Sequence, residues 1–313
     1  MNTQHDPRKN AAKTLFGWPD INGYGVASGC IEVIGVPSDA GNSIASGARF
    51  GPESVRRASA GLAVACNGID HGDIDSVETT DWVDAIDDVQ RAVAEIAARG
   101  GLPLVLGGDH AISYSSVAAL DQGERLNVVW FDAHTDLCEW RGGPWHNHKQ
   151  VLRRIAGLPH VNRILQIGHR GITYFDESQR SEKMTLITAR RAIALDDETL
   201  LACMPAGTPV YISVDIDAVD PRAAPGTGHP VPGGLDPLLL MRLGRCIAAQ
   251  RNVVGLDLME VNPLLDLNDM TSTVGAGILA AIVNGVAARR EATKSTHSTV
   301  SATHCRVETS FQS

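Results

Sequence analysis

Short apolar runs that end in polar residues recur along the chain. The first, IEVIGVP (31–37), ends at a proline. Later runs cover 102–110, 127–136, 162–171, 209–217 and 252–260. Unbroken apolar runs of this length predict strands that are buried on both faces. Each later run ends in residues that carry chemistry, as in GGDH, DAHTD and SVDID.

Helical patterns separate most of these runs. The clearest covers 81–99, where Val89, Val93 and Ile96 recur at three- and four-residue spacing before two glycines. Similar patterns cover 148–157, 197–204, 236–250 and 272–289. Buried strands that alternate with helices predict an α/β fold with a parallel sheet covered on both faces. In such sheets, ligands bind beyond the carboxyl ends of the strands.

The chain shows no convincing domain boundary. Residues 1–12 are polar and are expected to be flexible, and 13–290 are expected to form a single domain. From 291 onward the chain is rich in Ser and Thr with little periodicity, which predicts a disordered tail over 291–313.

Composition excludes several classes of function. The formal net charge is -9, which disfavours nucleic acid as the main partner, since phosphate binding needs clustered Lys and Arg. No unbroken apolar stretch reaches the roughly 18 residues of a membrane helix, and the polar N-terminus predicts no secretory signal. Six cysteines are scattered without CxxC spacing, so free thiols in a reducing cytoplasm are expected.

Three residues with metal-binding side chains alternate in VVWFDAHTDL (128–137). Asp132, His134 and Asp136 occupy every second position at the end of a predicted buried strand. Side chains at such spacing lie on one face of a strand, so these three are expected to converge. Two carboxylates so close together repel and are costly to desolvate, which favours a divalent cation between them.

The same pattern recurs at two other strand ends. Asp215 and Asp217 are two residues apart in ISVDIDAVDP, and His110 ends the run LPLVLGGDH. Together with the first motif these are more ligands than one ion needs, and they suit two ions that share bridging carboxylates. Oxygen and nitrogen ligands without thiolate favour Mn²⁺, with Ni²⁺ or Co²⁺ as alternatives. Two such ions hold a water molecule between them and acidify it.

These motifs carry a family resemblance. GGDH (107–110), DAHTD (132–136) and SVDIDAVDP (213–221) resemble the signature motifs of the ureohydrolases, the arginase and agmatinase family. GARFGPESVR (47–56) and GLDLMEVNP (255–263) resemble flanking segments, so the likeness covers about 30–289. It implies a three-layer α/β/α fold around a mostly parallel sheet of eight strands. It also implies a binuclear manganese centre that hydrolyses a guanidino group to urea and an amine.

The resemblance also assigns roles to single residues. It implies that His110, Asp132, Asp136 and Asp215 bind one ion. His134, Asp132, Asp215 and Asp217 then bind the other, so that Asp132 and Asp215 bridge the two. Glu260 matches the carboxylate that binds the guanidinium, and Asp109 and Asp220 match outer residues that orient ligands or local backbone.

The proton shuttle falls where this sequence departs from the family. The family uses a His after the second motif to protonate the leaving amine, and here the loop reads HNHK. The distance from the helix that follows favours His148, and the distance from DAHTD favours His146. We prefer His148, because loops vary in length more than helices do.

The substrate tail leaves several alternatives open. Wording such as APGTG is closer to agmatinases than to animal-type arginases, and Glu139 suits the terminal ammonium of agmatine. Arg141 suits instead a carboxylate, as in 4-guanidinobutyrate or 3-guanidinopropionate, while Trp140 and Trp145 suit a small pocket for guanidine. His229 replaces a Thr that typically lies near the guanidino group, so a substrate contact or plain packing role is expected for it.

The oligomeric state and the alternative functional classes remain to be considered. The resemblance implies a homo-oligomer, a trimer or a hexamer. A deacetylase of related fold would need one zinc and fewer of these ligands. A family member that binds metal without catalysis is supported only by the altered HNHK and GTGHP stretches. Arginase itself is a lesser alternative, because the Ser-Gly-Asn stretch typical of arginases is absent.

Overall fold

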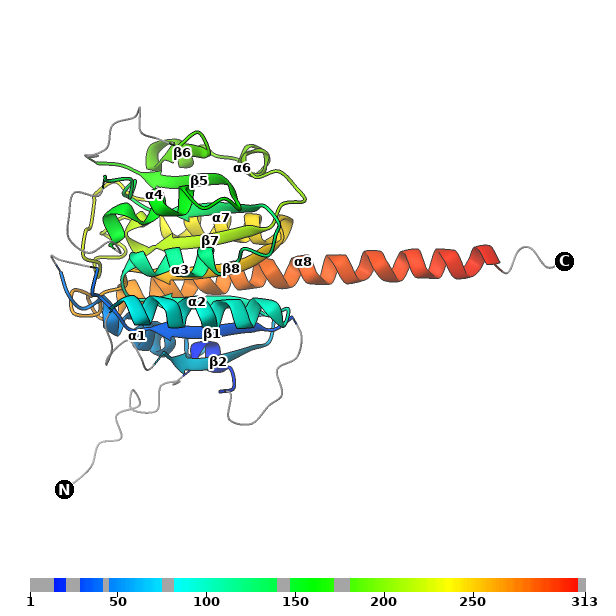
Figure 1. Cartoon of the computed structure of the whole chain (residues 1–313), viewed down its shortest axis with the longest axis horizontal. Helices are drawn as coiled ribbons and strands as arrows, with labels where there is room; N and C mark the ends of the chain where they lie inside the picture. The colour runs from blue at the N-terminus through cyan, green and yellow to red at the C-terminus, as the bar shows by residue number, and fades with distance from the viewer. Residues whose placement is uncertain are drawn as a thin grey trace, which may run out of the picture.

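The computed structural model describes residues 14–20, 29–41, 45–74, 82–139, 147–171 and 181–308, without the side chains of 82–85 and 296–308. Within these ranges eight strands form one sheet in the order β2-β1-β3-β8-β7-β4-β5-β6 (Figure 1). The strands are β1 (Ile31–Val36), β2 (Gly68–Asp73), β3 (Leu102–Gly107), β4 (Leu126–Phe131), β5 (Val161–His169), β6 (Met184–Thr188), β7 (Val210–Asp215) and β8 (Val253–Met259). Every neighbouring pair is parallel, which confirms the predicted α/β class.

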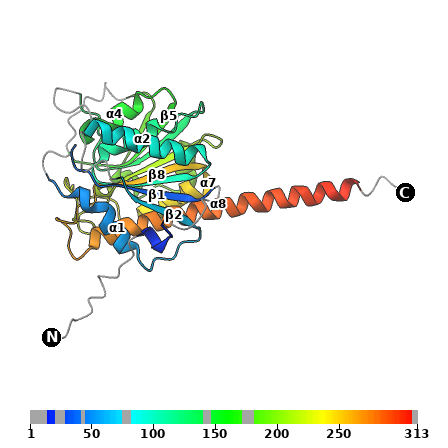
Figure 2. The ribbon, with the colours of Figure 1, turned by 60° about the horizontal axis from the view of Figure 1, so that its bottom comes forward.

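Helices cover both faces of the sheet and make three layers. The α-helices are α1 (Gly51–Ser59), α2 (Trp82–Ala98), α3 (Ser113–Ala118), α4 (Val151–Ala156), α5 (Ala189–Ala192), α6 (Asp197–Cys203), α7 (Pro237–Gln250) and α8 (Met270–Glu308). Figure 2 shows α2 and α4 on one side of the sheet and α1 and α8 on the other.

Each strand contributes to two hydrophobic cores because successive side chains point to opposite faces. In β3, Leu104 and Leu106 join the core beneath α1, α7 and α8, whereas Val105 joins the core beneath α2, α3 and α4. All six residues of β3 are buried. Burial on both faces explains why the central strands are continuous apolar runs in the sequence.

The two edge strands have weaker sequence patterns. Strand β2 reads GIDHGD, and its buried Asp70 accepts hydrogen bonds from the Arg56 guanidinium on α1 at 2.8 and 2.9 Å. In β2 this ion pair takes the place of some of the apolar packing by which a strand is recognised in a sequence. Strand β6 has five residues, of which two are buried.

Helix α8 extends through residues 291–308, the segment for which the sequence predicts a disordered tail. Ser and Thr are abundant there, but the chain has no Gly or Pro between Gly285 and Glu308 to break a helix. By length and composition alone, Met270–Ser295 is apolar enough to cross a membrane. However, 61% of its most apolar window is buried in the protein, where α8 packs against α1 and α7.

Candidate metal centre

The predicted ligands meet at the carboxyl ends of the four central strands. His110 follows β3, Asp132 follows β4, Asp215 ends β7 and Glu260 follows β8, and these strands are neighbours in the sheet. The GGDH turn brings the chain close to the segment after β1, where a Cβ at Gly108 would lie 1.8 Å from the carbonyl oxygen of Ser38. Only glycine fits there.

His110 faces the carboxylates with its Nδ1 atom. That nitrogen lies 3.0 Å from Asp215 Oδ2, 3.4 Å from Asp132 Oδ2 and 3.9 Å from Asp136 Oδ2. All four residues are buried. Nitrogen and oxygen atoms therefore converge on one point from three strand ends.

His134 lies at a second such point. Its Nδ1 is 2.9 Å from Asp217 Oδ2 and 3.6 Å from Asp132 Oδ1. Within the described residues, His110, Asp132 and Asp215 form one group whose ligand atoms lie within 4.8 Å of one another, and Asp132, His134 and Asp217 form another. The two oxygens of Asp132 thus serve two adjacent groups, which is the geometry of a bridging carboxylate.

Backbone amide groups fix these carboxylates before any cation binds. Asp132 Oδ1 accepts a hydrogen bond from the His134 N–H at 2.5 Å, and Asp215 Oδ1 accepts one from the Asp217 N–H at 2.8 Å. These are short local turns of the kind that Asp favours. Asp136 lies outside the two groups, with a backbone φ of 50°, a strained conformation that is common at functional sites.

The electrostatics indicate a site that requires positive charge. Burial raises the pKa of Asp136 and of Asp215, and the neighbouring carboxylates raise both further. Burial lowers the pKa of His134, but hydrogen bonds with Asp132 and Asp217 outweigh it and raise that pKa to about 12. The crowded carboxylates are thus stabilised by protons that they share with the imidazoles. In a metal site, a divalent cation supplies this positive charge instead.

A row of residues across the sheet supports His110, and sequence reasoning missed it. His110 Nε2 lies 2.8 Å from Ser213 Oγ, and the Trp130 ring stacks on the imidazole at 4.1 Å. Trp130 Nε1 donates to Asp132 Oδ2 at 2.8 Å. Buried Asp257 accepts hydrogen bonds from Tyr211 Oη at 2.6 Å and Ser113 Oγ at 2.7 Å. This row leaves Nδ1 of His110 as the nitrogen that faces the carboxylates.

Arg170 is a second support that the sequence did not reveal, although it lies near the end of the predicted run 162–171 and directly follows β5. Its guanidinium donates to the backbone oxygens of Asp217, Ala218 and Val219, and to that of Val231. It therefore ties the turn after β7 to the loop that carries His229.

A third buried group adjoins the first two. Asp109, His148 and Glu260 bring ligand atoms within 4.8 Å of one another, and His148 Nδ1 lies 3.6 Å from Asp109 Oδ2. Asp109 Oδ2 and both ring nitrogens of His148 are buried without a hydrogen-bond partner among the described residues. Glu260 Oε1 accepts the His110 N–H at 2.9 Å, and its backbone φ is 62°. Unpartnered polar atoms that face one another are suited to receive a ligand.

His229 and His169 occupy the surroundings of the site. The His229 ring lies 5.1 Å from that of His148 and 6.1 Å from that of His134. Its Nε2 atom is buried and has no hydrogen-bond partner in the part of the chain that the structure describes. Burial and the charges of His148 and His134 lower the pKa of His229. His169 Nδ1 instead contacts the backbone oxygen of Ala133 at 3.1 Å, a structural contact.

The structure describes only some of the residues that the sequence predicts to contact the tail of the substrate. Arg141, His146, Trp140 and Trp145 lie outside the described residues. Glu139 is described and exposed, at the edge of that gap.

Comparison with known proteins agrees with these motifs. Residues 30–284 match the sequence profile of the Arginase family. The chain is 34% identical over 269 residues to mitochondrial agmatinase of Gallus gallus, covering 79% of this chain and 78% of that protein. It is 34% identical over 266 residues to guanidinobutyrase of Pseudomonas aeruginosa, covering 79% and 83%.

A solved structure shares the whole architecture. Proclavaminate amidino hydrolase from Streptomyces clavuligerus superimposes with a TM-score of 0.80 at 31% identity, covering 90% of this chain and 99% of that chain. Sequence match, fold and strand-end motifs agree over most of the chain, and the chain belongs to the arginase family of ureohydrolases.

Proposed function

We propose that this protein is a binuclear metal-dependent amidinohydrolase that converts a guanidino compound, agmatine or a close analogue, to urea and an amine. The observation that supports this most is Asp132, whose two carboxylate oxygens serve two adjacent groups of His and Asp. Enzymes of the arginase family are binuclear metal enzymes. A single-metal hydrolase has no use for a shared carboxylate of this kind.

The proposed metal ligands fit a pair of hard or borderline cations. His110, Asp132, Asp136 and Asp215 would hold one ion, and His134, Asp132, Asp215 and Asp217 would hold the other. Imidazole and carboxylate ligands without thiolate favour Mn²⁺, with Ni²⁺ or Co²⁺ as alternatives. When bound, such ions supply the charge that makes water a nucleophile at neutral pH.

The third buried group is proposed to bind the guanidinium of the substrate. Burial raises the pKa of Glu260 and the nearby Asp109 charge raises it further, so a cation between the two carboxylates is strongly favoured. Guanidinium is planar and pairs with carboxylate oxygens through parallel hydrogen bonds. Glu260 would hold the substrate beside the metal ligands, because its Oε1 already contacts the His110 amide.

His148 is proposed to deliver the proton to the leaving amine. It lies in the third buried group, and neither of its ring nitrogens has a hydrogen-bond partner within the described ranges. Asp109 Oδ2, at 3.6 Å from Nδ1, would hold the ring so that Nε2 remains available to the amine. His146 is the competing candidate, and it lies outside the described residues.

The substrate is the least constrained part of the proposal. Glu139 would attract the ammonium of agmatine, and Arg141 would pair with the carboxylate of 4-guanidinobutyrate or 3-guanidinopropionate. The relatives named agmatinase and guanidinobutyrase represent these two options. His229 narrows the space between His134 and His148, which favours a slender or very small guanidino compound.

Urea release from the Mn²⁺-loaded protein tests the proposal. The panel holds agmatine, arginine, 4-guanidinobutyrate, 3-guanidinopropionate and guanidine, repeated with Ni²⁺ and Co²⁺. We expect one substrate to dominate, with activity lost on chelation and restored by metal. Glu139→Gln should impair an ammonium substrate selectively, and Arg141→Gln a carboxylate substrate. Two bound ions without urea from any substrate would contradict the proposed reaction.

We also propose an oligomeric state and a cellular location for the protein. A homo-oligomer, a trimer or a hexamer, is inferred from the family resemblance, and light scattering of the purified protein measures its mass. A cytoplasmic location is supported by the free thiols of five described cysteines, and cell fractionation tests it.

A further inference from the structure

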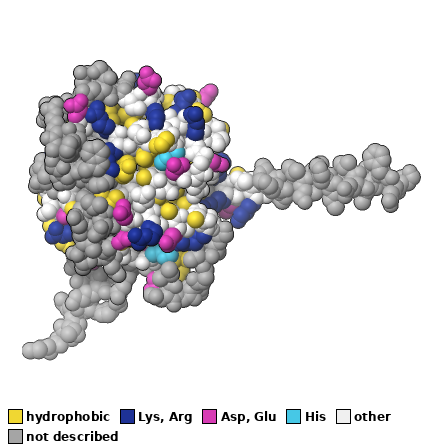
Figure 3. Space-filling view, in the orientation of Figure 1, with side chains coloured by type: hydrophobic (Ala, Val, Ile, Leu, Met, Phe, Trp, Pro, Cys, Tyr) yellow, Lys and Arg dark blue, Asp and Glu magenta, His cyan; other side chains and the backbone are white. Residues whose placement is uncertain are grey.

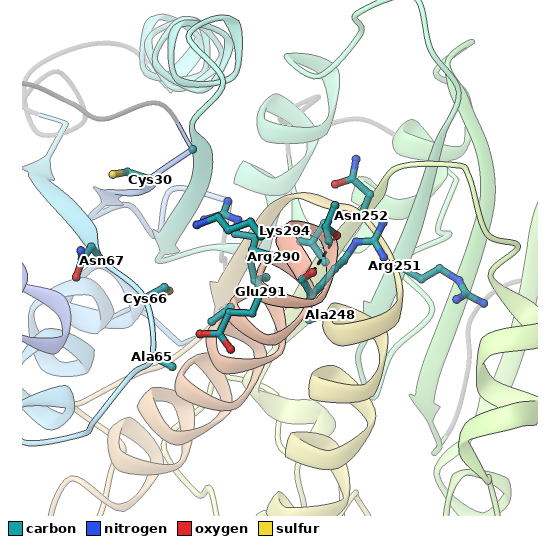
Figure 4. A pocket seen from close by; sticks show the side chains of 16 residues that line it. Cys30, Ala65, Cys66, Asn67, Ala248, Arg251, Asn252, Arg290, Glu291 and Lys294 are labelled. Atoms are coloured by element: carbon teal, nitrogen blue, oxygen red, sulfur yellow. Dashed lines mark hydrogen bonds between the residues drawn. The ribbon is translucent and has the colours of Figure 1, made fainter. Parts of the chain in front are cut away.

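A large cavity lies at the opposite end of the sheet from the metal centre. It has a volume of about 800 Å³ and lies beside the amino ends of β1, β2 and β8, near the end of α7 and the part of α8 that leaves the body (Figure 4). Small-molecule sites usually span about 300–1,000 Å³. A six-residue strand is on the order of 20 Å long, so this cavity is a separate region from the candidate metal centre.

Positive charge dominates the lining of this cavity. Arg251, Arg289, Arg290 and Lys294 line it, with Glu291 as its only acidic residue among the described ones. Figure 3 shows basic side chains gathered where α8 leaves the body. This concentration contrasts with the formal net charge of -9 for the whole chain.

The position of Arg251 has a structural explanation. Its guanidinium donates to the backbone oxygen of Leu201, in the last turn of α6, and to that of Met204, the residue that follows this helix. A cation at a helix C-terminus is favourable there. Arg251 therefore contributes its charge to the cavity, while its hydrogen bonds are already made.

The other three basic residues have no such explanation. Within the described part of the chain, the side chains of Arg289, Arg290 and Lys294 have no ion pair and no hydrogen bond. Figure 4 shows Arg290 and Lys294 on α8 between the segments that carry Cys66 and Asn252. Cys66 and Arg290 both line the cavity, and the charge of Arg290 opposes the increase that burial causes in the pKa of Cys66.

Part of the cavity wall is apolar. Cys30, Ala65 and Cys66 line it beside the basic side chains and keep part of their surface exposed to solvent. A bare phosphate ion would leave this surface in water, whereas a ligand with an apolar body would cover it. Guanidinium groups bind phosphate and carboxylate through paired hydrogen bonds, and two arginines with one lysine match more than one negative charge.

We propose that this cavity binds a small organic polyanion, a molecule with an apolar body and two or more phosphate or carboxylate charges. Arg289, Arg290 and Lys294 would hold the charges, and the apolar wall would cover the body. The site requires neither a metal ion nor the guanidino substrate. Failure of the proposed reaction would therefore leave this binding proposal unaffected.

Calorimetry on the full-length, metal-loaded protein tests this proposal with two probes, adenosine diphosphate and naphthalene-2,6-dicarboxylate. We expect at least one to bind saturably with one site per chain and a Kd below about 1 mM. The double variant Arg290→Ala/Lys294→Ala should weaken binding at least about tenfold, since charge-assisted hydrogen bonds are lost. Raised salt should weaken it too.

Matched controls separate this site from others. Arg190→Ala removes an exposed arginine elsewhere and should leave the affinity unchanged. Glu291→Gln should tighten binding, because it removes the acidic residue of the cavity. All variants keep the metal centre, so heat from chelation by the probe is common to all of them. Absence of saturable binding by both probes, or equal affinity in the double variant, would overturn the proposal.

Discussion

The two ends of the parallel sheet concentrate opposite charges in different ways. At the carboxyl end, carboxylates and imidazoles form three groups whose ligand atoms lie within 4.8 Å of one another, and all of these residues except His134 are buried. At the amino end, basic side chains from α7 and α8 line an open cavity, and three of them contact no acid in the described residues.

The difference shows how a charged site is built. Buried charges must be paired or hydrogen-bonded, so the carboxylates at the carboxyl end depend on backbone amides and imidazoles. Solvated charges need no partner, because water screens them. A lost group should therefore have a large effect at the first end and a small effect at the second.

The largest effect is expected from Asp132→Ala. Because each Asp132 oxygen serves one of the two ligand groups, the variant should lose both ions and activity together. The rate loss should exceed the 10–100-fold effect typical of outer-sphere partners. Elemental analysis and urea release measure the two quantities, with exposed Glu198→Ala as control. Retention of two ions and full turnover would remove Asp132 from the centre.

The next effect in size is expected from His148→Ala. The variant should keep its metals but lose about 10²–10⁴-fold in kcat, the range for loss of a general acid. Steady-state kinetics on the best substrate, with His146→Ala measured in parallel, give the answer. If only the His146 variant is slow, the shuttle is His146.

A smaller effect is expected from Ser213→Ala. Its hydroxyl contacts Nε2 of His110, and loss of such a partner typically weakens metal binding about 10–100-fold. Competition with a chelator measures the affinity. Ser115→Ala is the matched control, since the Ser115 hydroxyl is buried and has no hydrogen-bond partner among the residues that the structure describes. Equal metal affinities in the two variants would argue against this supporting role.

The smallest effect is expected from Asp266→Ala. Asp266 accepts the N–H groups of Thr271 and Ser272 in the first turn of α8. Loss of a helix cap costs about 0.5–2 kcal/mol of unfolding free energy. Denaturant unfolding, at a pH where the metals remain bound, measures this change.

The same residue gives a prediction for acid stability. Burial raises the pKa of Asp266, but hydrogen bonds from Thr271 and Ser272 outweigh it and lower that pKa. A lowered folded-state pKa means that this contribution is complete above the unfolded value of about 3.9 and is lost as pH falls through the folded value. Asp266→Asn keeps an acceptor without titrating. Its stability, relative to wild type, should therefore improve as the pH falls below about 4.

Much of the carboxyl end could be predicted from the sequence. Asp132, His134 and Asp136 are close in the chain, and so are Asp215 and Asp217, so each set follows a single strand end. However, β4 ends at Phe131, and local turns rather than strand alternation place these side chains. The supporting row could not be found this way. Trp130 pairs with Ser213, and Ser213 with Asp257, through the register of three strands that are distant in the sequence.

The sequence was less informative where packing decides the structure. Strand β2 carries Asp70, His71 and Asp73, whose polar character hides a strand that an ion pair with α1 stabilises. The cationic cavity draws on residues from 29 to 294, with no motif that joins them. The choice between His146 and His148 depends on a loop, and loop lengths vary without a periodic pattern.

The order of strands also bears on how the protein is made by the ribosome. Strands β7 and β8, which are synthesised last, lie between β3 and β4 in the finished sheet. A nascent chain that has reached β6 therefore holds two strands whose future neighbours do not yet exist. Such exposed strand edges are prone to aggregate. The proposed ligands Asp215 and Asp217 emerge at the end of β7, so the proposed metal centre would be complete only as that gap is filled.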